Sequence, residues 1–122
     1  MTTVLLVDDD EGVRTFVKRA LEIDGYAVQE AADGAEALDL LRGSAADTGL
    51  VLSDIVMPVM DGIEFIKNVR ATGQHNSLPI LILTTETSQD KRDQGKAAGG
   101  TGWIVKPFDP EKLISVINRV VH

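Results

Sequence analysis

Cysteine is absent from the 122-residue sequence, histidine occurs twice, and aromatic residues make up 4% of the chain. The lack of cysteine excludes disulfide bonds, thiolate nucleophiles and cysteine-based zinc sites. His75 and His122 lie far apart in the sequence, so we expect no histidine metal site either. No apolar run approaches the ~20 residues that a membrane span needs, and Met1-Thr2-Thr3 lacks the basic and apolar regions of a secretory signal. We therefore expect a soluble, cytoplasmic protein with no membrane partner.

Basic residues are also few: 12 Lys plus Arg stand against 19 Asp plus Glu, which gives a formal net charge of −7. Nucleic acids bind clusters of Lys and Arg, which this sequence lacks, so we expect no nucleic acid partner. An excess of acid suits a bound cation instead, provided that several carboxylates converge. The length suits one compact domain, and we expect residues 1–122 to form it.

Four short apolar runs indicate strands. They are nearly continuous rather than alternating, which is typical of strands covered on both faces. The runs are Val4–Val7, Leu50–Leu52, Ile80–Leu83 and Trp103–Val105. A weaker, alternating run over Tyr26–Glu30 predicts a fifth strand nearer the edge of the sheet.

Apolar residues at helical spacing lie between these strands. The first set is Val13, Phe16, Val17, Ala20 and Leu21, ending before Gly25. The next two are Ala37, Leu38 and Leu41, stopped by Gly43, and Ile63, Ile66 and Val69, stopped near Gly73. The last helix follows an N-cap acid and an N1 proline, Asp109-Pro110, and presents Leu113, Ile114, Ile117, Val120 and Val121.

The segment Ser88–Ala98 has almost no apolar stripe, and as a helix it would bury little beyond Ala97 and Ala98. We expect it to be the loosest helix of the fold. Five strand and helix alternations predict a three-layer α/β fold, in which a mostly parallel sheet has five helices on its two faces. For five strands, we expect the flavodoxin-like order 2-1-3-4-5.

Polar residues of complementary type follow the predicted strands. Asp8, Asp9 and Asp10 follow the first strand, Asp54 the third, Thr84 and Thr85 the fourth, and Lys106 the fifth. In such sheets, ligands bind beyond the carboxyl ends of the strands, where the strand order reverses. We therefore expect these side chains to lie together at one end of the sheet.

The chemistry of this set points to phosphoryl binding or transfer. Converging carboxylates repel one another unless a cation intervenes, and Mg2+ commonly takes one or two carboxylates together with phosphate oxygens. Asp8, Asp9 and Asp54 fit that description. Lys106 supplies a compensating positive charge, and the Thr84 hydroxyl can donate to a phosphoryl oxygen. A carboxylate is the candidate nucleophile.

Five short motifs carry a family resemblance that extends over essentially the whole chain. They are Val7-Asp8-Asp9, Ser53-Asp54, Met57-Pro58-Val59-Met60-Asp61-Gly62, Leu83-Thr84 and Lys106-Pro107-Phe108. Together they resemble the receiver domain of two-component response regulators, in its single-domain, CheY-like form. Any one of these motifs is weak, whereas all five in order at strand ends are specific.

The resemblance implies that Asp54 accepts a phosphoryl group from a sensor histidine kinase or phosphotransfer protein. It implies that Asp8, Asp9, Asp54 and the backbone carbonyl of Val56 hold Mg2+, for which Mn2+ can substitute. Lys106 would pair with the phosphoryl group. Such a protein is a phosphoacceptor in signalling rather than an enzyme, although it catalyses its own phosphorylation and slow dephosphorylation.

The resemblance also implies a switch and an output. Thr84 would move toward the phosphoryl oxygens, Trp103 would change rotamer with it, and the bond before Pro107 would be cis. This coupling would bias a surface made of the fourth helix, fifth strand and fifth helix. Since we expect a chain that stops at His122 to be a stand-alone, monomeric receiver, its output would be a protein partner, with the flagellar motor switch of chemotaxis as our leading hypothesis.

Several alternatives remain open. A same-fold alternative is an adaptor, phosphorelay intermediate or phosphate sink of a non-chemotaxis pathway. An aspartyl-nucleophile phosphatase is disfavoured, because its usual second Asp is replaced by Val56, and Asp8–Gly12 lacks the ligand spacing of a calcium-binding EF-hand. Asp10 and Glu11 are interpreted as helix-capping and first-turn acids, and Asp61-Gly62 as the start of a helix. Val56 and Glu86 are expected to influence phosphoryl lifetime.

Overall fold

The computed structural model describes residues 2–44, 48–55, 60–71, 77–85, 88–106 and 109–121. Strands and helices alternate along this part of the chain, as the hydrophobic pattern predicts. The elements are β1 (Thr3–Val7), α1 (Glu11–Ile23), β2 (Ala27–Ala31), α2 (Gly34–Ser44), β3 (Thr48–Ser53), α3 (Gly62–Ala71), β4 (Ile80–Thr84), α4 (Gln89–Ala98), β5 (Gly102–Val105) and α5 (Pro110–Val121).

The strands form one parallel sheet in the order β2-β1-β3-β4-β5, which confirms the predicted topology. The register aligns the carboxyl ends of the central strands, since Val7 of β1 pairs with Ser53 of β3. At the other side, Thr84 of β4 pairs with Val105 of β5. The residues that follow these strand ends are therefore brought to one edge of the sheet, although they are far apart in sequence.

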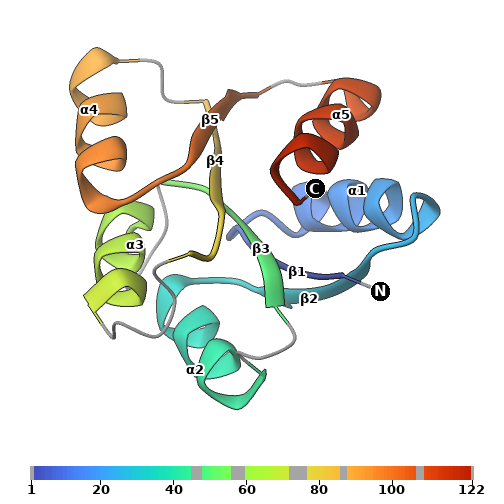
Figure 1. Ribbon diagram of the computed structural model, residues 1–122, viewed down its shortest axis with the longest axis horizontal. Coiled ribbons are helices and arrows are strands. Elements are labelled where there is room, and N and C mark those ends of the chain that lie inside the picture. Colours follow the sequence, from blue (N-terminus) through green and yellow to red (C-terminus); the bar gives the residue numbers. More distant parts are fainter. Residues whose placement is uncertain are drawn as a thin grey trace.

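Helices cover both faces of the sheet, and each face has its own hydrophobic core (Figure 1). Leu5 and Val7 of β1 contribute to the core beneath α2, α3 and α4, whereas Val4 and Leu6 contribute to the core beneath α1 and α5. Because successive side chains of a strand point to opposite faces, a strand covered on both faces needs apolar residues at every position. This requirement accounts for the continuous apolar runs.

Many of the acids cap helices. The Asp10 carboxylate accepts hydrogen bonds from the backbone of Gly12 and Val13, which confirms its predicted role at the start of α1. Equivalent backbone contacts begin α2, α3 and α5, where the acceptors are Asp33, Asp61 and Asp109. Ser88 caps α4 in the same way. Much of the acidic excess thus serves local structure.

Some expectations about element boundaries and burial are wrong. The second strand begins at Ala27 rather than Tyr26, whose ring is buried and whose hydroxyl donates to Asn118 of α5. Helix α2 continues through Gly43 to Ser44, because a single glycine costs a helix only ~1 kcal/mol. Phe16, expected in the buried stripe of α1, is 48% exposed, and it lines an open groove between α1 and α5.

Helix α4 buries little apolar surface, as predicted, but the residues that it buries differ. Gly95 and Ala98 are buried, whereas Ala97 is exposed. A Cβ on Gly95 would lie 2.8 Å from Cδ1 of Ile82 and 3.3 Å from the Trp103 ring, so the glycine allows α4 to lie close to the sheet. Within the described residues, no helix is long and apolar enough to span a membrane. The expected looseness of α4 stays a prediction.

Candidate functional site

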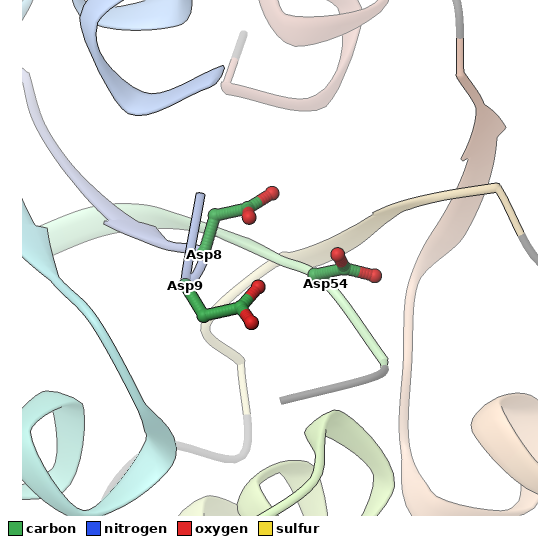
Figure 2. Close-up of side chains that lie close together, drawn as sticks. All are labelled: Asp8, Asp9 and Asp54. Carbon is green, nitrogen blue, oxygen red and sulfur yellow. The ribbon is translucent and has the colours of Figure 1, made fainter. Parts of the chain in front are cut away.

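Three carboxylates meet at the carboxyl end of the sheet. Asp8 and Asp9 directly follow β1, and Asp54 directly follows β3, so the pairing of these strands places them together. One oxygen from each residue lies within 4.8 Å of the other two, and Figure 2 shows the side chains gathered at the adjacent strand ends. Asp8 is buried, Asp54 is half-buried and Asp9 is exposed. The structure thus unites the acids that the sequence singled out for a metal site.

Lys106 joins this cluster from the end of β5. Its Nζ donates to Asp8 Oδ2 at 2.6 Å and to Asp54 Oδ2 at 3.1 Å. Its backbone N–H donates to the carbonyl of Thr84 at 2.8 Å, which ties the end of β5 to the end of β4. One ammonium group therefore contacts two carboxylates that come from different strands, and it partly offsets their mutual repulsion.

Burial and charge oppose each other in this cluster. Burial raises the pKa of Asp8, and the hydrogen bonds from Lys106 and from the backbone of Asp10 reduce that effect without cancelling it. For Lys106, burial lowers the pKa, but the hydrogen bond to Asp8 and the negative charge of Asp54 outweigh burial, so its pKa is raised. Both directions follow from a lysine held between acids in a poorly solvated site.

The Asp54 side chain is held by the backbone of the next residue as well as by Lys106. The Ile55 N–H donates to Asp54 Oδ1 at 2.7 Å, and the Asp54 N–H donates to the carbonyl of Val7 at 3.0 Å. Lys106 contacts the second oxygen, Oδ2. The carboxylate is therefore oriented toward the cluster by contacts from two directions.

Gly62, the first residue of α3, has a role that its predicted place at a helix start does not reveal. Its N–H donates to the carbonyl of Ile55 at 2.7 Å, and a Cβ at this position would lie 2.0 Å from the Asp54 carbonyl oxygen. Rigid backbone cannot yield to such an overlap. Glycine is therefore required where α3 begins, because α3 lies directly against the peptide that carries Asp54. In the sequence, Asp61-Gly62 ends one of the five motifs and predicts the start of a helix, and neither feature reports this approach.

Thr84 and Trp103 lie on the neighbouring strands β4 and β5. Thr84 is fully buried, and Trp103 pairs with Ile82, two residues before Thr84. Since side chains alternate along a strand, Trp103 and Thr84 share one face of the sheet, the face that α4 covers. The Arg92 guanidinium of α4 lies 5.7 Å from the centre of the indole ring. The structure places both predicted switch residues on the same side, and their movement stays a prediction.

The donor set suits a hard divalent cation. Carboxylate oxygens are the ligands that Mg2+ prefers, and three acids with one lysine leave negative charge for a cation to neutralise. An incoming phosphoryl group would find the Lys106 ammonium beside Asp54. Val56, whose carbonyl was expected to complete the ligand set, lies outside the described residues, as do Pro107, Glu86 and both histidines.

The sequence is similar to known proteins over nearly its whole length. A family model described as the response regulator receiver domain matches residues 4–118. The response regulator MprA of Mycobacterium sp. strain KMS is 42% identical over 119 residues, which cover 98% of this chain and 50% of that protein. MprA of Mycobacterium avium strain 104 is 43% identical with the same coverage. The chain spans about half the length of the curated relatives it matches.

Solved structures share the architecture. The chemotaxis protein CheY4 of Vibrio cholerae superposes with a TM-score of 0.92 at 48% identity, with 98% of each chain covered. A CheY-like receiver domain protein from Methanospirillum hungatei JF-1 gives a TM-score of 0.91 at 28% identity, covering 99% of this chain and 94% of that one. The five-stranded fold is therefore CheY-like, as expected from the sequence.

The Lys106→Met variant tests the balance of charge in the site. In metal-free buffer at neutral pH, we expect the free energy of unfolding to fall by about 3 kcal/mol, because buried Asp8 keeps its charge and loses its cation. The deficit should shrink as the pH falls through the raised pKa of Asp8, since protonation removes the uncompensated charge. Urea unfolding at neutral and mildly acidic pH measures both effects.

Lys112→Met is the matched control, because Lys112 is an exposed lysine of α5. Its stability should change by less than about 0.5 kcal/mol at either pH. If Lys106→Met lost the same free energy of unfolding at both pH values, this result would contradict the assigned charge balance.

Proposed function

Because the chain belongs to the response regulator receiver domain family, we propose that Asp54 accepts a phosphoryl group from a phosphohistidine of a sensor kinase or phosphotransfer protein. The observation that carries this assignment is the Lys106 ammonium, which bridges Asp54 and Asp8 at hydrogen-bond distance. Receiver domains are signalling domains rather than classical enzymes, so the phosphatase alternative is not retained. We take residues 1–122 as one receiver domain.

In the transfer step, a carboxylate oxygen of Asp54 attacks the phosphorus atom of the donor. A new O–P bond forms, the N–P bond to the donor imidazole breaks, and its electron pair stays on the imidazole nitrogen. Lys106 then contacts the transferred phosphoryl group, which carries more negative charge than the Asp54 carboxylate did. The backbone N–H of Ile55 keeps the acceptor carboxylate oriented. Positioning and charge neutralisation supply most of the catalysis in such transfers.

Asp8, Asp9 and Asp54 are the residues that would hold Mg2+, which neutralises phosphoryl oxygens and aligns the donor when bound. Three oxygens within 4.8 Å of one another support this assignment, as does the incomplete compensation by a single lysine. Mn2+ has the same preference for oxygen ligands and can substitute. The carbonyl of Val56 completes our proposed ligand set.

Replacement of Asp54 by Asn tests the acceptor assignment. With acetyl phosphate and Mg2+, intact-mass measurement should detect one added phosphoryl group on the wild type and none on Asp54→Asn, because the amide is not nucleophilic. Chelation of the metal should abolish the wild-type signal. Asp39→Asn, which changes an exposed acid of α2, should be phosphorylated like the wild type. Undiminished labelling of Asp54→Asn would assign the phosphoryl group to another residue.

Replacement of Asp9 by Ala tests the metal assignment. Mg2+ at about 100 times its Kd should raise the wild-type free energy of unfolding by about 2.7 kcal/mol, because it binds only the folded state. We expect Asp9→Ala to lose this increment and to be at least as stable as the wild type without metal, since one repelling charge is gone.

Urea unfolding with and without Mg2+ measures the effect of Asp9→Ala. Glu11→Ala, an exposed acid in the first turn of α1, is the control and should retain the metal-dependent increment. Retention of the increment by Asp9→Ala would place the cation elsewhere.

We further propose that phosphorylation changes the surface formed by α4, β5 and α5. Thr84 would move toward the phosphoryl oxygens, and Trp103, on the same face of the sheet, would move with it. The shallow packing of α4 supports this role, because a helix that buries only Gly95 and Ala98 costs little to displace. The indole Nε1 is buried without a hydrogen-bond partner among the described residues, which further lowers the cost of leaving its present position.

The output is proposed to be binding to a protein partner. The 48% identity to the chemotaxis protein CheY4, with 98% of that chain covered, supports a chemotaxis role, for which we propose the flagellar motor switch as the partner. The 42% identity to MprA supports the second candidate, a role in another two-component pathway as an adaptor, relay intermediate or phosphate sink. Both candidates use the same acceptor site and differ in the partner.

Partner binding separates these two candidates. The chemotaxis hypothesis predicts that the phosphorylated protein binds an isolated motor switch protein at least about tenfold more tightly than Asp54→Asn does, because the switched surface forms only after phosphorylation. Equal binding by the phosphorylated protein and by Asp54→Asn would favour the non-chemotaxis pathway.

Trp103 is the only tryptophan, so the fluorescence emission of the protein should change on phosphorylation.

A further inference from the structure

Arg14 contacts the backbone of the acidic site rather than its carboxylates. It lies in α1, and its side chain is only 17% exposed. Its NH1 group donates to the backbone carbonyl of Asp8 at 2.6 Å, and its Nε lies 3.5 Å from a carboxylate oxygen of Glu30 on β2. The guanidinium thus connects α1 to β2 and to Asp8, the residue that follows β1.

The bonded carbonyl belongs to the peptide that links Asp8 to Asp9. The other side of Asp8 is also held, because its N–H donates to the carbonyl of Ala31 at 3.1 Å. The Asp8 carboxylate has its own partners, Lys106 and the backbone of Asp10. Between them, these contacts fix the direction in which the chain leaves β1.

Asp9 depends on that direction more than its neighbours do. Its side chain is exposed, and within the part of the chain that the structure describes no hydrogen bond or ion pair holds its carboxylate. Its place near Asp8 and Asp54 is therefore set by the backbone before it. The carbonyl of that peptide accepts the hydrogen bond from Arg14.

We propose that Arg14 is a positioning residue for the metal site: by holding the Asp8–Asp9 peptide, it directs the Asp9 carboxylate toward Asp8 and Asp54. Glu30 orients the guanidinium through the ion pair at Nε. This inference rests on the proposed function, because it assigns Asp9 to a Mg2+ site. Arginine suits the task, since one planar group can donate to a carbonyl and pair with a carboxylate at once.

A charge effect and a positioning effect of Arg14 predict opposite changes in Mg2+ affinity when Arg14 is replaced. Loss of a nearby cation, by itself, should strengthen Mg2+ binding, because repulsion between like charges falls. Loss of a positioning contact should weaken it, since outer residues that orient metal ligands commonly contribute about tenfold or more to affinity. A weaker affinity therefore cannot come from the charge of Arg14.

The chain offers a matched control for this comparison. Lys18 is another α1 cation that pairs with Glu30, at 3.4 Å, and no contact joins it to Asp8. Lys18→Met removes one positive charge from the same carboxylate as Arg14→Met does. It leaves the hydrogen bond to the Asp8 carbonyl in place.

Calorimetric titration of Mg2+ into the wild type, Arg14→Met and Lys18→Met tests the proposal, well below each melting temperature. We expect Kd for Mg2+ to rise about tenfold in Arg14→Met and to be unchanged or lower in Lys18→Met. Phosphorylation by acetyl phosphate should then require about tenfold more Mg2+ for half-maximal labelling of Arg14→Met. At saturating Mg2+, its extent of labelling should match the wild type.

An unchanged Kd in Arg14→Met would overturn the proposal, and so would an equal rise in both variants. If Arg14→Met does not fold, Arg14→Lys takes its place, because lysine keeps the positive charge but lacks the planar group that holds the Asp8 carbonyl and Glu30 at once; a rise in Kd is expected and an unchanged Kd overturns the proposal. Failure of the wild type to bind Mg2+ would instead refute the proposed function, which keeps the two failures distinct.

Discussion

The ammonium group of Lys106, bonded to Asp8 and Asp54, is the interaction on which the site depends. Two carboxylates at adjacent strand ends repel each other, and burial of Asp8 makes its charge more costly still. Lys106, at the end of β5, offsets both effects, and the two carboxylates raise the pKa of this lysine. The remaining carboxylate, exposed Asp9, completes the acidic cluster to which our proposal assigns the divalent cation.

This arrangement requires a sheet that is apolar on both faces. With helices covering each face, polar side chains are absent from the interiors of β1, β3, β4 and β5 and collect where these strands end. The helices are attached unequally. Helix α3 lies against the peptide of Asp54 through Gly62, whereas α4 buries only Gly95 and Ala98. The helix nearest the acceptor thus packs closely against its peptide, and the helix proposed to respond buries few residues.

Much of this was predictable from the sequence. Continuous apolar runs predicted the parallel sheet and its strand order, and the polar residues that follow them predicted the convergence of Asp8, Asp9, Asp54 and Lys106. Boundaries were less predictable: α2 passes through Gly43, because packing along a helix outweighs the propensity of one residue. The exposure of Phe16 was missed because an apolar periodicity does not say how wide the covered face is.

The sequence by itself determined the class of fold and the chemical inventory of the site, because periodicity and residue type are local properties of the chain. Only the tertiary structure decided which partners those groups take. The close approach of Gly62 to Asp54 and the hydrogen bond from Arg14 to the Asp8 carbonyl involve backbone atoms, which every residue carries alike. No sequence pattern marks such contacts, since they arise from the distance and angle at which separate elements pack.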